Sequence, residues 1–230
     1  MIRSALLVLV NFCLMFLSIP VLLFCVIFGL PDTFLAYGRW LMRVDRWVLG
    51  IDVAVTGLER LDAATPYVFM INHLSFLDAP LLATVLDRPF RAVVKRFVFR
   101  VPVLGLGMRY AGYVPLDKEG VGEGRKRIAR AASLIRERGY SFLIFPEGTR
   151  SRKGDLLPFR RGGFFLALET GTPIVPITVR GTYELMPRGQ KFVRKGTVGI
   201  AFHEPIPVTG YATETMPELM ERVRRAISSV

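Results

Sequence analysis

The first thirty residues contain the longest uncharged stretch of the chain. No charged residue occurs at positions 4–31, where leucine, valine, isoleucine and phenylalanine predominate. A run of this length is long enough to cross the hydrocarbon core of a membrane as a helix. A secretory signal peptide also begins with a basic residue and an apolar core, but this run is too long and lacks a small-residue cleavage site. Pro20 removes a backbone donor near its middle, so one spanning helix and a hairpin of two half-helices both remain open.

The next segment combines basic and aromatic residues. Arg39, Arg43 and Arg46 recur at helical spacing beside Trp40 and Trp47. Basic side chains flanked by tryptophans suit a helix at a membrane–water interface. The alternative is a surface helix that packs its tryptophan side on the rest of the protein. We expect residues 1–50 to be membrane-anchoring helices, with the remaining domain on the cytoplasmic face of the cell membrane under the positive-inside tendency.

Charge and cysteine usage limit the possible partners. The net charge of +12 and the pI near 10.3 imply an anionic partner, such as lipid headgroups, a phosphorylated substrate or nucleic acid. Cys13 and Cys25 both lie in the apolar run, which excludes a disulfide framework in the rest of the chain. The sequence has two histidines, His73 and His203, and no CxxC pair. We therefore expect no zinc site, and we also expect no other metal and no cofactor.

Beyond residue 50, apolar runs of strand length alternate with helix-like segments. Strands are expected at residues 51–56, 67–71, 91–94, 113–116, 140–145, 174–179 and 197–202. Helices are expected at residues 76–86, 123–138, 163–169 and 216–227. Pro102 and the glycines from 105 to 112 predict a loop. This alternation predicts a single α/β domain with a mixed, largely buried sheet over residues 51–230.

A histidine and an aspartate follow the strand expected at 67–71. His73 comes at its carboxyl end, where ligands tend to bind in open α/β sheets, and Asp78 lies five residues later. In one continuous helix their side chains would point roughly 140° apart, so they can meet only if His73 lies in a turn before the helix. Ser75 and Asp78 have the Ser-x-x-Asp spacing of a capping box, which predicts a helix beginning near Ser75. A histidine held by a carboxylate can take a proton from a hydroxyl; in the alternative, Asp78 binds only backbone donors at the helix start.

A second polar turn, Phe-Pro-Glu-Gly-Thr-Arg at residues 145–150, follows the strand expected at 140–145. Pro146 and Gly148 permit a sharp turn, Glu147 can orient a neighbouring cation, and Arg150 offers a planar fork for two phosphate oxygens. More basic residues follow in the sequence: Arg152, Lys153, Arg160 and Arg161. A solvated basic loop is the alternative. Together with the histidine and aspartate, the turn suggests acyl transfer onto a phosphorylated alcohol.

The sequence lacks the motifs of nucleotide-binding proteins and of serine hydrolases. No GxxxxGK[ST] occurs, and the glycines at 120–124 lack the preceding buried strand of a dinucleotide-binding fold. GxSxG is absent from the sequence, which excludes the nucleophile elbow of a serine hydrolase. The residues favour direct attack by a substrate hydroxyl.

Taken in order, these segments resemble the glycerolipid acyltransferase family, most closely the PlsC-type 1-acyl-sn-glycerol-3-phosphate acyltransferases. The family motif N-H-x-x-x-x-D is matched by Asn72, His73 and Asp78, and F-P-E-G-T-R-S by residues 145–151. Its V-P-I strand is matched by residues 175–177. The motif G-x-x-x-x-D-R is matched by residues 112–118, except that Lys118 replaces the arginine. Lysine keeps the charge but loses the bidentate fork.

The resemblance implies the family's mixed-sheet α/β acyltransferase domain at 51–230, an N-terminal membrane-associated helical segment, and an enzyme of phospholipid biosynthesis. His73 would be the general base that deprotonates the sn-2 hydroxyl of lysophosphatidic acid, and Asp78 would orient its ring. The hydroxyl oxygen would attack the thioester of acyl-CoA or acyl carrier protein, the co-substrate, and give phosphatidic acid. The residues that it implies around the substrates are Glu147, Gly148, Thr149, Arg150, Lys118, Lys95 and Arg160.

Two alternatives to this function stay open at this stage. A sibling acyltransferase would use another lysolipid acceptor, such as lyso-ornithine lipid. A membrane-tethered nucleic-acid-binding protein would use the basic surface, but it would need neither His73 nor the turn at 145–150. We therefore expect membrane lipids as partners and no nucleic acid.

Overall fold

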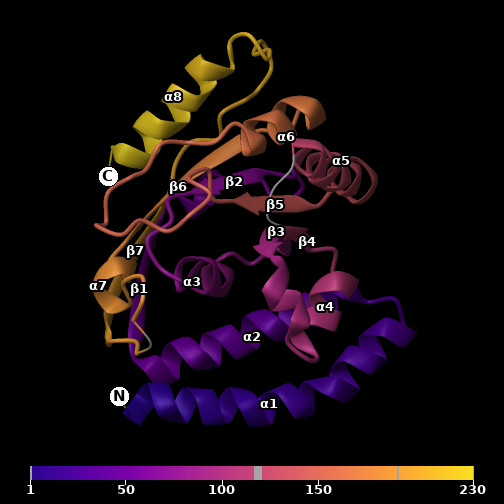
Figure 1. The fold of residues 1–230 in the computed structure, drawn as a ribbon, viewed down its shortest axis with the longest axis vertical. Coiled ribbons are helices and arrows are strands. Elements are labelled where there is room, and N and C mark those ends of the chain that lie inside the picture. The colour runs from indigo at the N-terminus through magenta and orange to yellow at the C-terminus, as the bar shows by residue number, and fades with distance from the viewer. Residues whose placement is uncertain (1, 117–120, 191, 230) are drawn as a thin grey trace.

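The computed structural model describes residues 2–116, 121–190 and 192–229, whose fold is drawn in Figure 1. In these residues one sheet has the strand order β1-β7-β6-β2-β5-β3-β4. Its strands are β1 (Ile51–Thr56), β2 (Val68–Ile71), β3 (Phe90–Lys95), β4 (Val114–Leu116), β5 (Ser141–Ile144), β6 (Ile174–Arg180) and β7 (Gly196–Phe202). The β6–β7 pair is antiparallel, and the other neighbouring pairs are parallel. The expected mixed sheet is confirmed, and each expected strand is present within two residues at either end.

Helices cover both faces of the sheet (Figure 1). One face packs against α3 (Asp78–Val85) and α7 (Thr182–Leu185), and the other against α5 (Val121–Arg138), α6 (Gly162–Thr170) and α8 (Met216–Ser228). Strand β2 serves both layers, because successive side chains of a strand point to opposite faces. Phe69 and Ile71 join the first cluster, while Val68 and Met70 join the second. This double burial explains why β2 reads as a continuous apolar run.

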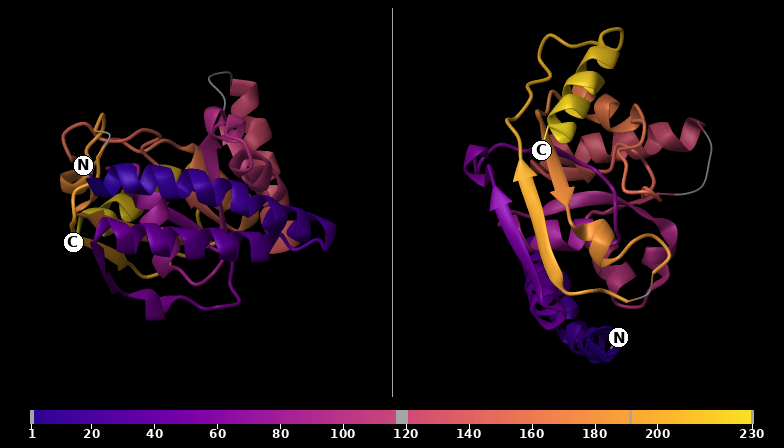
Figure 2. Two further views of the ribbon diagram at one scale, coloured as in Figure 1. Left: turned by 90° about the horizontal axis from the view of Figure 1, so that it is seen from below. Right: turned by 90° about the vertical axis from the view of Figure 1, so that its left-hand side faces the viewer.

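The N-terminal segment forms two helices, α1 (Ile2–Ile27) and α2 (Pro31–Leu49), which run antiparallel beside each other in Figures 1 and 2. Pro20 lies inside α1, so the chain does not turn there. The turn comes at Gly29, whose φ of 66° suits a residue without a side chain. Within the described residues, no helix has both the length and the apolar character that crossing a membrane requires. The membrane anchor at residues 1–50 stays a prediction.

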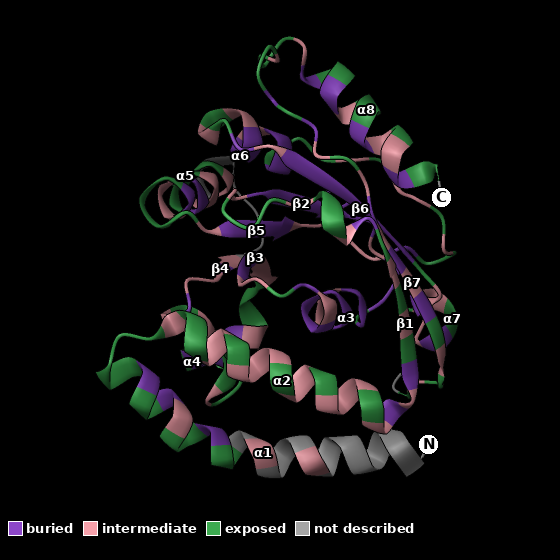
Figure 3. Ribbon diagram, turned by 180° about the vertical axis from the view of Figure 1, so that it is seen from behind, coloured by how far each residue is buried: buried purple, intermediate pink, exposed green. Residues whose placement is uncertain are grey.

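In helix α2, Arg43 and Arg46 contact α3, whereas both tryptophans are exposed. Arg43 Nε donates to the Thr84 carbonyl oxygen over 3.0 Å, and Arg46 donates to the Thr84 hydroxyl over 3.4 Å. Thr84 lies in the last turn of α3, where unpaired carbonyls favour cationic partners. Trp40 is 53% and Trp47 82% exposed. The alternative in which the tryptophan side packs on the domain is therefore wrong, and Figure 3 shows exposed residues along the outer side of the hairpin.

Helix α4 (Leu104–Tyr110) occupies the region that the glycines predicted to be a loop. A Cβ on Gly105 would lie 2.2 Å from the Phe99 carbonyl oxygen, and a Cβ on Gly107 would lie 2.2 Å from the Phe34 ring. The glycines therefore let α4 approach α2 and the short 3-10 helix η2 (Arg96–Arg100) closely. A second 3-10 turn, η1 (Leu58–Arg60), follows β1. The loop prediction was wrong for residues 104–110, because the packing of α4 outweighs the poor helix propensity of glycine.

Candidate active site

His73 and Asp78 meet at the carboxyl end of β2. The helix begins at Asp78 rather than near Ser75, so His73 lies in the extended turn before it, as a contact between the two side chains requires. His73 Nδ1 lies 2.9 Å from Asp78 Oδ2. The Asp78 side chain is fully buried, whereas that of His73 is 20% exposed. The imidazole is thus held from the protein side and reachable from outside.

The Asp78 carboxylate also organises the backbone. Its Oδ2 accepts hydrogen bonds from the backbone N–H groups of Leu74 and Ser75, both over 2.8 Å. Its Oδ1 accepts from the Thr182 hydroxyl over 2.6 Å. Of the two hydrogen bonds of a capping box, the one from the Ser75 N–H to the Asp78 carboxylate is present. The Ser75 hydroxyl donates to the Met186 carbonyl oxygen over 2.7 Å instead. The two roles considered for Asp78 therefore coexist: it binds backbone donors and the imidazole.

This environment fixes the tautomer of His73. A carboxylate surrounded by donors acts as an acceptor, so Nδ1 carries the proton toward Asp78 and the lone pair lies on Nε2. The His73 ring stacks on Phe145, with ring centroids 3.8 Å apart. The stacking partner and the carboxylate together hold the imidazole in one orientation. An oriented Nε2 lone pair is what a general base requires.

The turn at 145–150 lies against His73, as the strand positions predicted. Strands β2 and β5 pair in parallel with Met70 opposite Ile144, so both turns leave the sheet at one edge. The Ser151 N–H donates to the His73 carbonyl oxygen over 2.8 Å. The histidine and the turn at 145–150 therefore lie together at one site.

Glu147 has a different role from the one expected. Its Oε1 accepts from the His73 N–H over 2.7 Å and its Oε2 from the Leu157 N–H over 2.8 Å. Burial raises the pKa of this carboxyl above its ordinary value, and the two backbone donors act in the opposite direction. Within the described residues both oxygens are thus bound by backbone groups and not by a cation. Glu147 joins the two turns, and the expectation that it orients a neighbouring cation was wrong.

Arg160 lies over the tip of the same turn. Gly148 has φ +69°, and a Cβ there would come within 2.7 Å of Arg160 Nε. The Arg160 N–H also donates to the Pro146 carbonyl oxygen over 2.7 Å. Glycine at 148 is therefore needed both for the backbone conformation and for the approach of this guanidinium.

Of the three further site candidates, the structure describes Thr149 and Lys95. The Thr149 hydroxyl lies 3.4 Å from an Arg188 guanidinium nitrogen, which also donates to the Arg150 carbonyl oxygen over 3.2 Å. Lys95 ends β3, the neighbour of β5, and is exposed. No contact joins it to His73 within the described chain. Lys118 lies outside the described residues.

Asn72, Thr182 and Arg188 were not assigned roles from their positions in the sequence. Asn72 Nδ2 donates to the Val179 carbonyl oxygen over 2.8 Å, and the Val179 N–H donates back to Asn72 Oδ1 over 2.7 Å. Thr182 follows β6, which pairs in parallel with β2. The available signal was the V-P-I strand, since the residues after its end reach the same sheet edge.

We expect Thr182→Val to lower the free energy of unfolding by about 1–3 kcal/mol, because it leaves Asp78 Oδ1 buried without a donor. Turnover should fall as well, since the carboxylate is then held less firmly against His73. Urea unfolding in non-ionic detergent and turnover of the same preparation measure the two effects. Thr182→Ser keeps the hydroxyl and serves as the matched control. Equal losses in the serine and valine variants would contradict a role for the hydroxyl.

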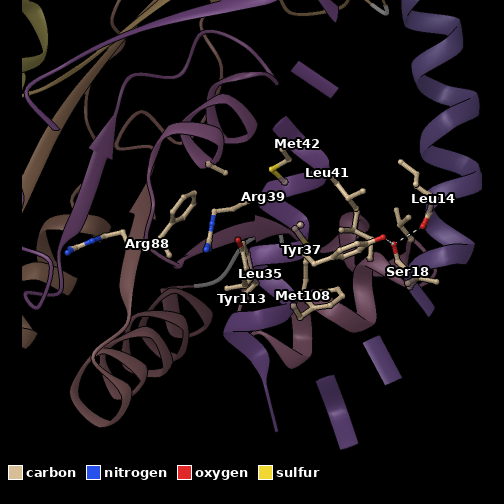
Figure 4. Close-up of a pocket in the computed structure, with 17 residues that line it drawn as sticks. Leu14, Ser18, Leu35, Tyr37, Arg39, Leu41, Met42, Arg88, Met108 and Tyr113 are labelled. Carbon is tan, nitrogen blue, oxygen red and sulfur yellow. Dashed lines mark hydrogen bonds between the residues drawn. The ribbon is translucent and has the colours of Figure 1, made fainter. Parts of the chain in front are cut away.

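An apolar cavity of about 480 Å³ lies between the α1–α2 hairpin, α4 and the domain (Figure 4). The Ser18 and Tyr37 hydroxyls, 3.1 Å apart, join the two helices beside it. Arg39 also lines the cavity, and burial lowers the pKa of its guanidinium. Among the described residues, no group of histidine, cysteine, aspartate or glutamate is arranged to hold a metal ion.

Comparisons with known proteins found similar sequences and a similar structure. Residues 52–180 match the family model described as "Acyltransferase". A chloroplastic 1-acyl-sn-glycerol-3-phosphate acyltransferase from Brassica napus is 39% identical over 66% of this chain and 44% of that protein. The human 1-acyl-sn-glycerol-3-phosphate acyltransferase beta is 30% identical over 82% of this chain and 68% of that protein. The chain thus spans less than half of the plant relative.

A solved structure is similar over the whole length. The crystal structure of the 1-acyl-sn-glycerophosphate (LPA) acyltransferase PlsC from Thermotoga maritima has a TM-score of 0.80 and 25% sequence identity. The match covers 100% of this chain and 97% of that one.

Proposed function

Because the chain belongs to the acyltransferase family, we propose that it transfers an acyl group from a thioester to the sn-2 hydroxyl of lysophosphatidic acid. The product is phosphatidic acid, and the pathway is phospholipid biosynthesis. The observation that carries the proposal is the His73–Asp78 pair, 2.9 Å apart, directly against the turn that holds Arg150. A proton acceptor and a phosphate-binding fork are thus part of one sheet edge.

The reaction needs one base and no covalent intermediate on the enzyme. His73 Nε2 takes the proton of the acceptor hydroxyl while its oxygen attacks the thioester carbonyl. The carbon–sulfur bond breaks, an ester carbon–oxygen bond forms, and the proton passes from the imidazolium to the departing thiolate. Asp78 stabilises the imidazolium because its buried carboxylate carries the opposite charge next to Nδ1. The donor is acyl-CoA or acyl carrier protein, used as co-substrate.

The acceptor phosphate binds at the turn after β5. Arg150 offers a bidentate fork, and the Arg160 guanidinium over Gly148 adds a second positive charge. Thr149 contributes a hydroxyl on the same turn, and the lysine candidates are Lys95 at the end of β3 and Lys118. Glu147 supports this arrangement by fixing the turn to the His73 backbone.

We expect Arg150→Ala to raise KM for lysophosphatidic acid roughly ten- to hundredfold, the usual effect of removing a charged hydrogen bond. Turnover at saturating acceptor should change far less. Initial rates over a range of acceptor concentrations, at fixed donor, give both constants. Arg152→Ala, an exposed arginine two residues away, is the matched control. A rise confined to KM for the thioester would instead place Arg150 at the donor.

The hairpin supplies the membrane contact in this proposal. Helices α1 and α2 expose many large apolar side chains, among them Leu17, Phe24, Ile27 and Trp47. Apolar groups that the domain leaves uncovered, with tryptophans beside arginines, suit burial at a membrane interface. We place the domain on the cytoplasmic face of the cell membrane, where the soluble donor reaches it from water.

The cavity beneath the hairpin suits the hydrocarbon part of a substrate. Its lining is largely aliphatic and aromatic, with Leu41, Met42 and Met108 among its residues. Its volume of about 480 Å³ lies in the range of small-molecule pockets. A lipid acceptor that arrives from the bilayer can therefore place a chain there while its headgroup faces the sheet edge.

Purified full-length protein with lysophosphatidic acid, tested with acyl-CoA and with acylated carrier protein, provides the direct test. Formation of phosphatidic acid with either donor supports the assignment. A panel of other lysolipids, including lyso-ornithine lipid, with the preferred donor separates a sibling acyltransferase from it. Faster acylation of another acceptor would replace lysophosphatidic acid while keeping the chemistry.

A further inference from the structure

The corner between η2 and α4 contains a hollow that the proposed active site does not use. It has a volume of about 290 Å³ and is lined by Arg96, Phe99, Arg100, Arg109 and Pro115. Three of these five residues carry a guanidinium, and none is acidic. Neither the imidazole of His73 nor the fork of Arg150 lines it. Converging guanidinium groups favour an anion, and their planar forks match the oxygens of a phosphate.

The backbone at this corner adopts a conformation that costs free energy. Val103 has φ 60° and ψ −58°, and the Leu104 N–H donates to the Pro102 carbonyl oxygen over 2.6 Å. This is a γ-turn with positive φ, which is rare and strained for a β-branched residue. Such strain persists where surrounding packing maintains it, and it is concentrated at binding sites. Here it joins η2, which bears Arg96 and Arg100, to α4, which bears Arg109.

Close packing of η2 against α4 keeps the backbone of this corner in its strained conformation. Phe99 is buried, and its carbonyl oxygen would lie 2.2 Å from a Cβ on Gly105. The first turn of α4 therefore lies directly on η2. The two arginines of η2 and the one of α4 are held around a single hollow.

Apolar side chains surround the arginines. Phe97 and Leu106 are each 60% exposed, and Val101 and Leu104 are exposed too. The same corner is joined to the hairpin, since the Tyr110 hydroxyl donates to the Cys25 carbonyl oxygen at the end of α1. Figures 1 and 3 show α4 beside the end of the hairpin where α1 passes into α2. Exposed apolar groups that flank cations occur where a protein meets a membrane surface.

We propose that the arginine hollow binds the phosphate group of an anionic membrane phospholipid. Phe97 and Leu106 enter the acyl region beside it, while Arg100 and Arg109 bind the phosphate oxygens at headgroup depth. The apolar rim favours a lipid over the phosphates of a soluble donor, which would leave these side chains in water. The site holds the domain against the bilayer at a second point besides the hairpin.

The test uses full-length protein in non-ionic detergent micelles, titrated with phosphatidylglycerol, with bound lipid measured by native mass spectrometry. The double variant Arg100→Gln/Arg109→Gln should bind phosphatidylglycerol roughly ten- to thirtyfold more weakly, since each arginine near an anionic surface contributes appreciably. Titration with zwitterionic phosphatidylcholine should show little difference. The double variant Arg222→Gln/Arg225→Gln removes the same charge from exposed positions on α8 and should bind like the unaltered protein.

The proposal is overturned if the hollow variant binds phosphatidylglycerol as well as the α8 variant does. If its KM for acyl-CoA rises at the same time, the hollow belongs to the donor instead. A third variant, Arg100→Lys/Arg109→Lys, keeps the charge without the forks, and circular dichroism checks the fold of all three. Lipid binding is measured without turnover, so the result does not depend on the proposed reaction.

Discussion

Replacing His73 by alanine should lower turnover roughly 10²–10⁴-fold, the usual contribution of a general base. The loss should fall mainly on kcat, because His73 takes a proton and makes no contact that binds the acceptor phosphate. The fold should survive, since the neighbouring hydrogen bonds of Asp78 with Leu74, Ser75 and Thr182 do not involve the imidazole. Steady-state rates with lysophosphatidic acid and the preferred thioester measure the change.

His203 provides the matched control for this prediction. It is the other histidine of the chain, and its Nε2 lies 2.8 Å from the Thr178 hydroxyl, away from the His73 turn. Burial lowers the pKa of His203, which favours its neutral form near pH 7. His203→Gln should therefore keep nearly full turnover. A His73→Ala enzyme as active as His203→Gln would remove His73 from the reaction.

The sequence predicted the central strands β2, β5 and β6 well because they are buried on both faces. Apolar runs such as 68–71 and 174–177 can be recognised as strands from the local sequence alone, and their ends mark the edge of the sheet where ligands bind. The contact between His73 and residues 145–151 was predicted from one observation, that both segments follow strands ending at this edge. Within the described residues, the spacing argument also held, since the helix begins after His73.

The remaining features depend on contacts between distant parts of the chain. Thr182 donates to Asp78, from which it is separated by 104 positions in the sequence. No local sequence pattern predicts such a contact. Glu147 appeared as a surface partner for a cation, but the approach of the His73 and Leu157 backbones buries it. Helix α4 was missed because its glycines serve tertiary packing, which local propensity does not include. In α2, Arg43 and Arg46 contact Thr84 at the end of α3, where carbonyls lack helical partners.

The charge of Asp78 can be separated from its structural role by Asp78→Asn. The amide oxygen can still accept from the Leu74 and Ser75 N–H groups and from His73 Nδ1. The amide nitrogen then faces the Thr182 hydroxyl, whose oxygen can accept. In the opposite orientation the amide NH2 group would face the Leu74 and Ser75 N–H groups, donor against donor, so this orientation is disfavoured. The amide oxygen therefore stays next to His73 Nδ1, and the His73 tautomer should be preserved. We expect the unfolding free energy to change by no more than about 1–2 kcal/mol.

Turnover of Asp78→Asn should nevertheless fall on the order of 10²–10³-fold. The imidazolium that forms during proton transfer loses a buried negative charge 2.9 Å from Nδ1, and an amide dipole replaces only part of that stabilisation. The loss should stay below the roughly 10⁴-fold fall expected when such a change also imposes the wrong tautomer.

Turnover rates and urea unfolding, measured on one preparation of Asp78→Asn, distinguish the possible roles of Asp78. Near-normal turnover would show that Asp78 only caps the helix. A low rate together with a large fall in the free energy of unfolding would show that the activity is lost because the hydrogen bonds of Asp78 hold the fold. Preserved stability with a rate reduced at least a hundredfold would assign the catalytic contribution to its charge.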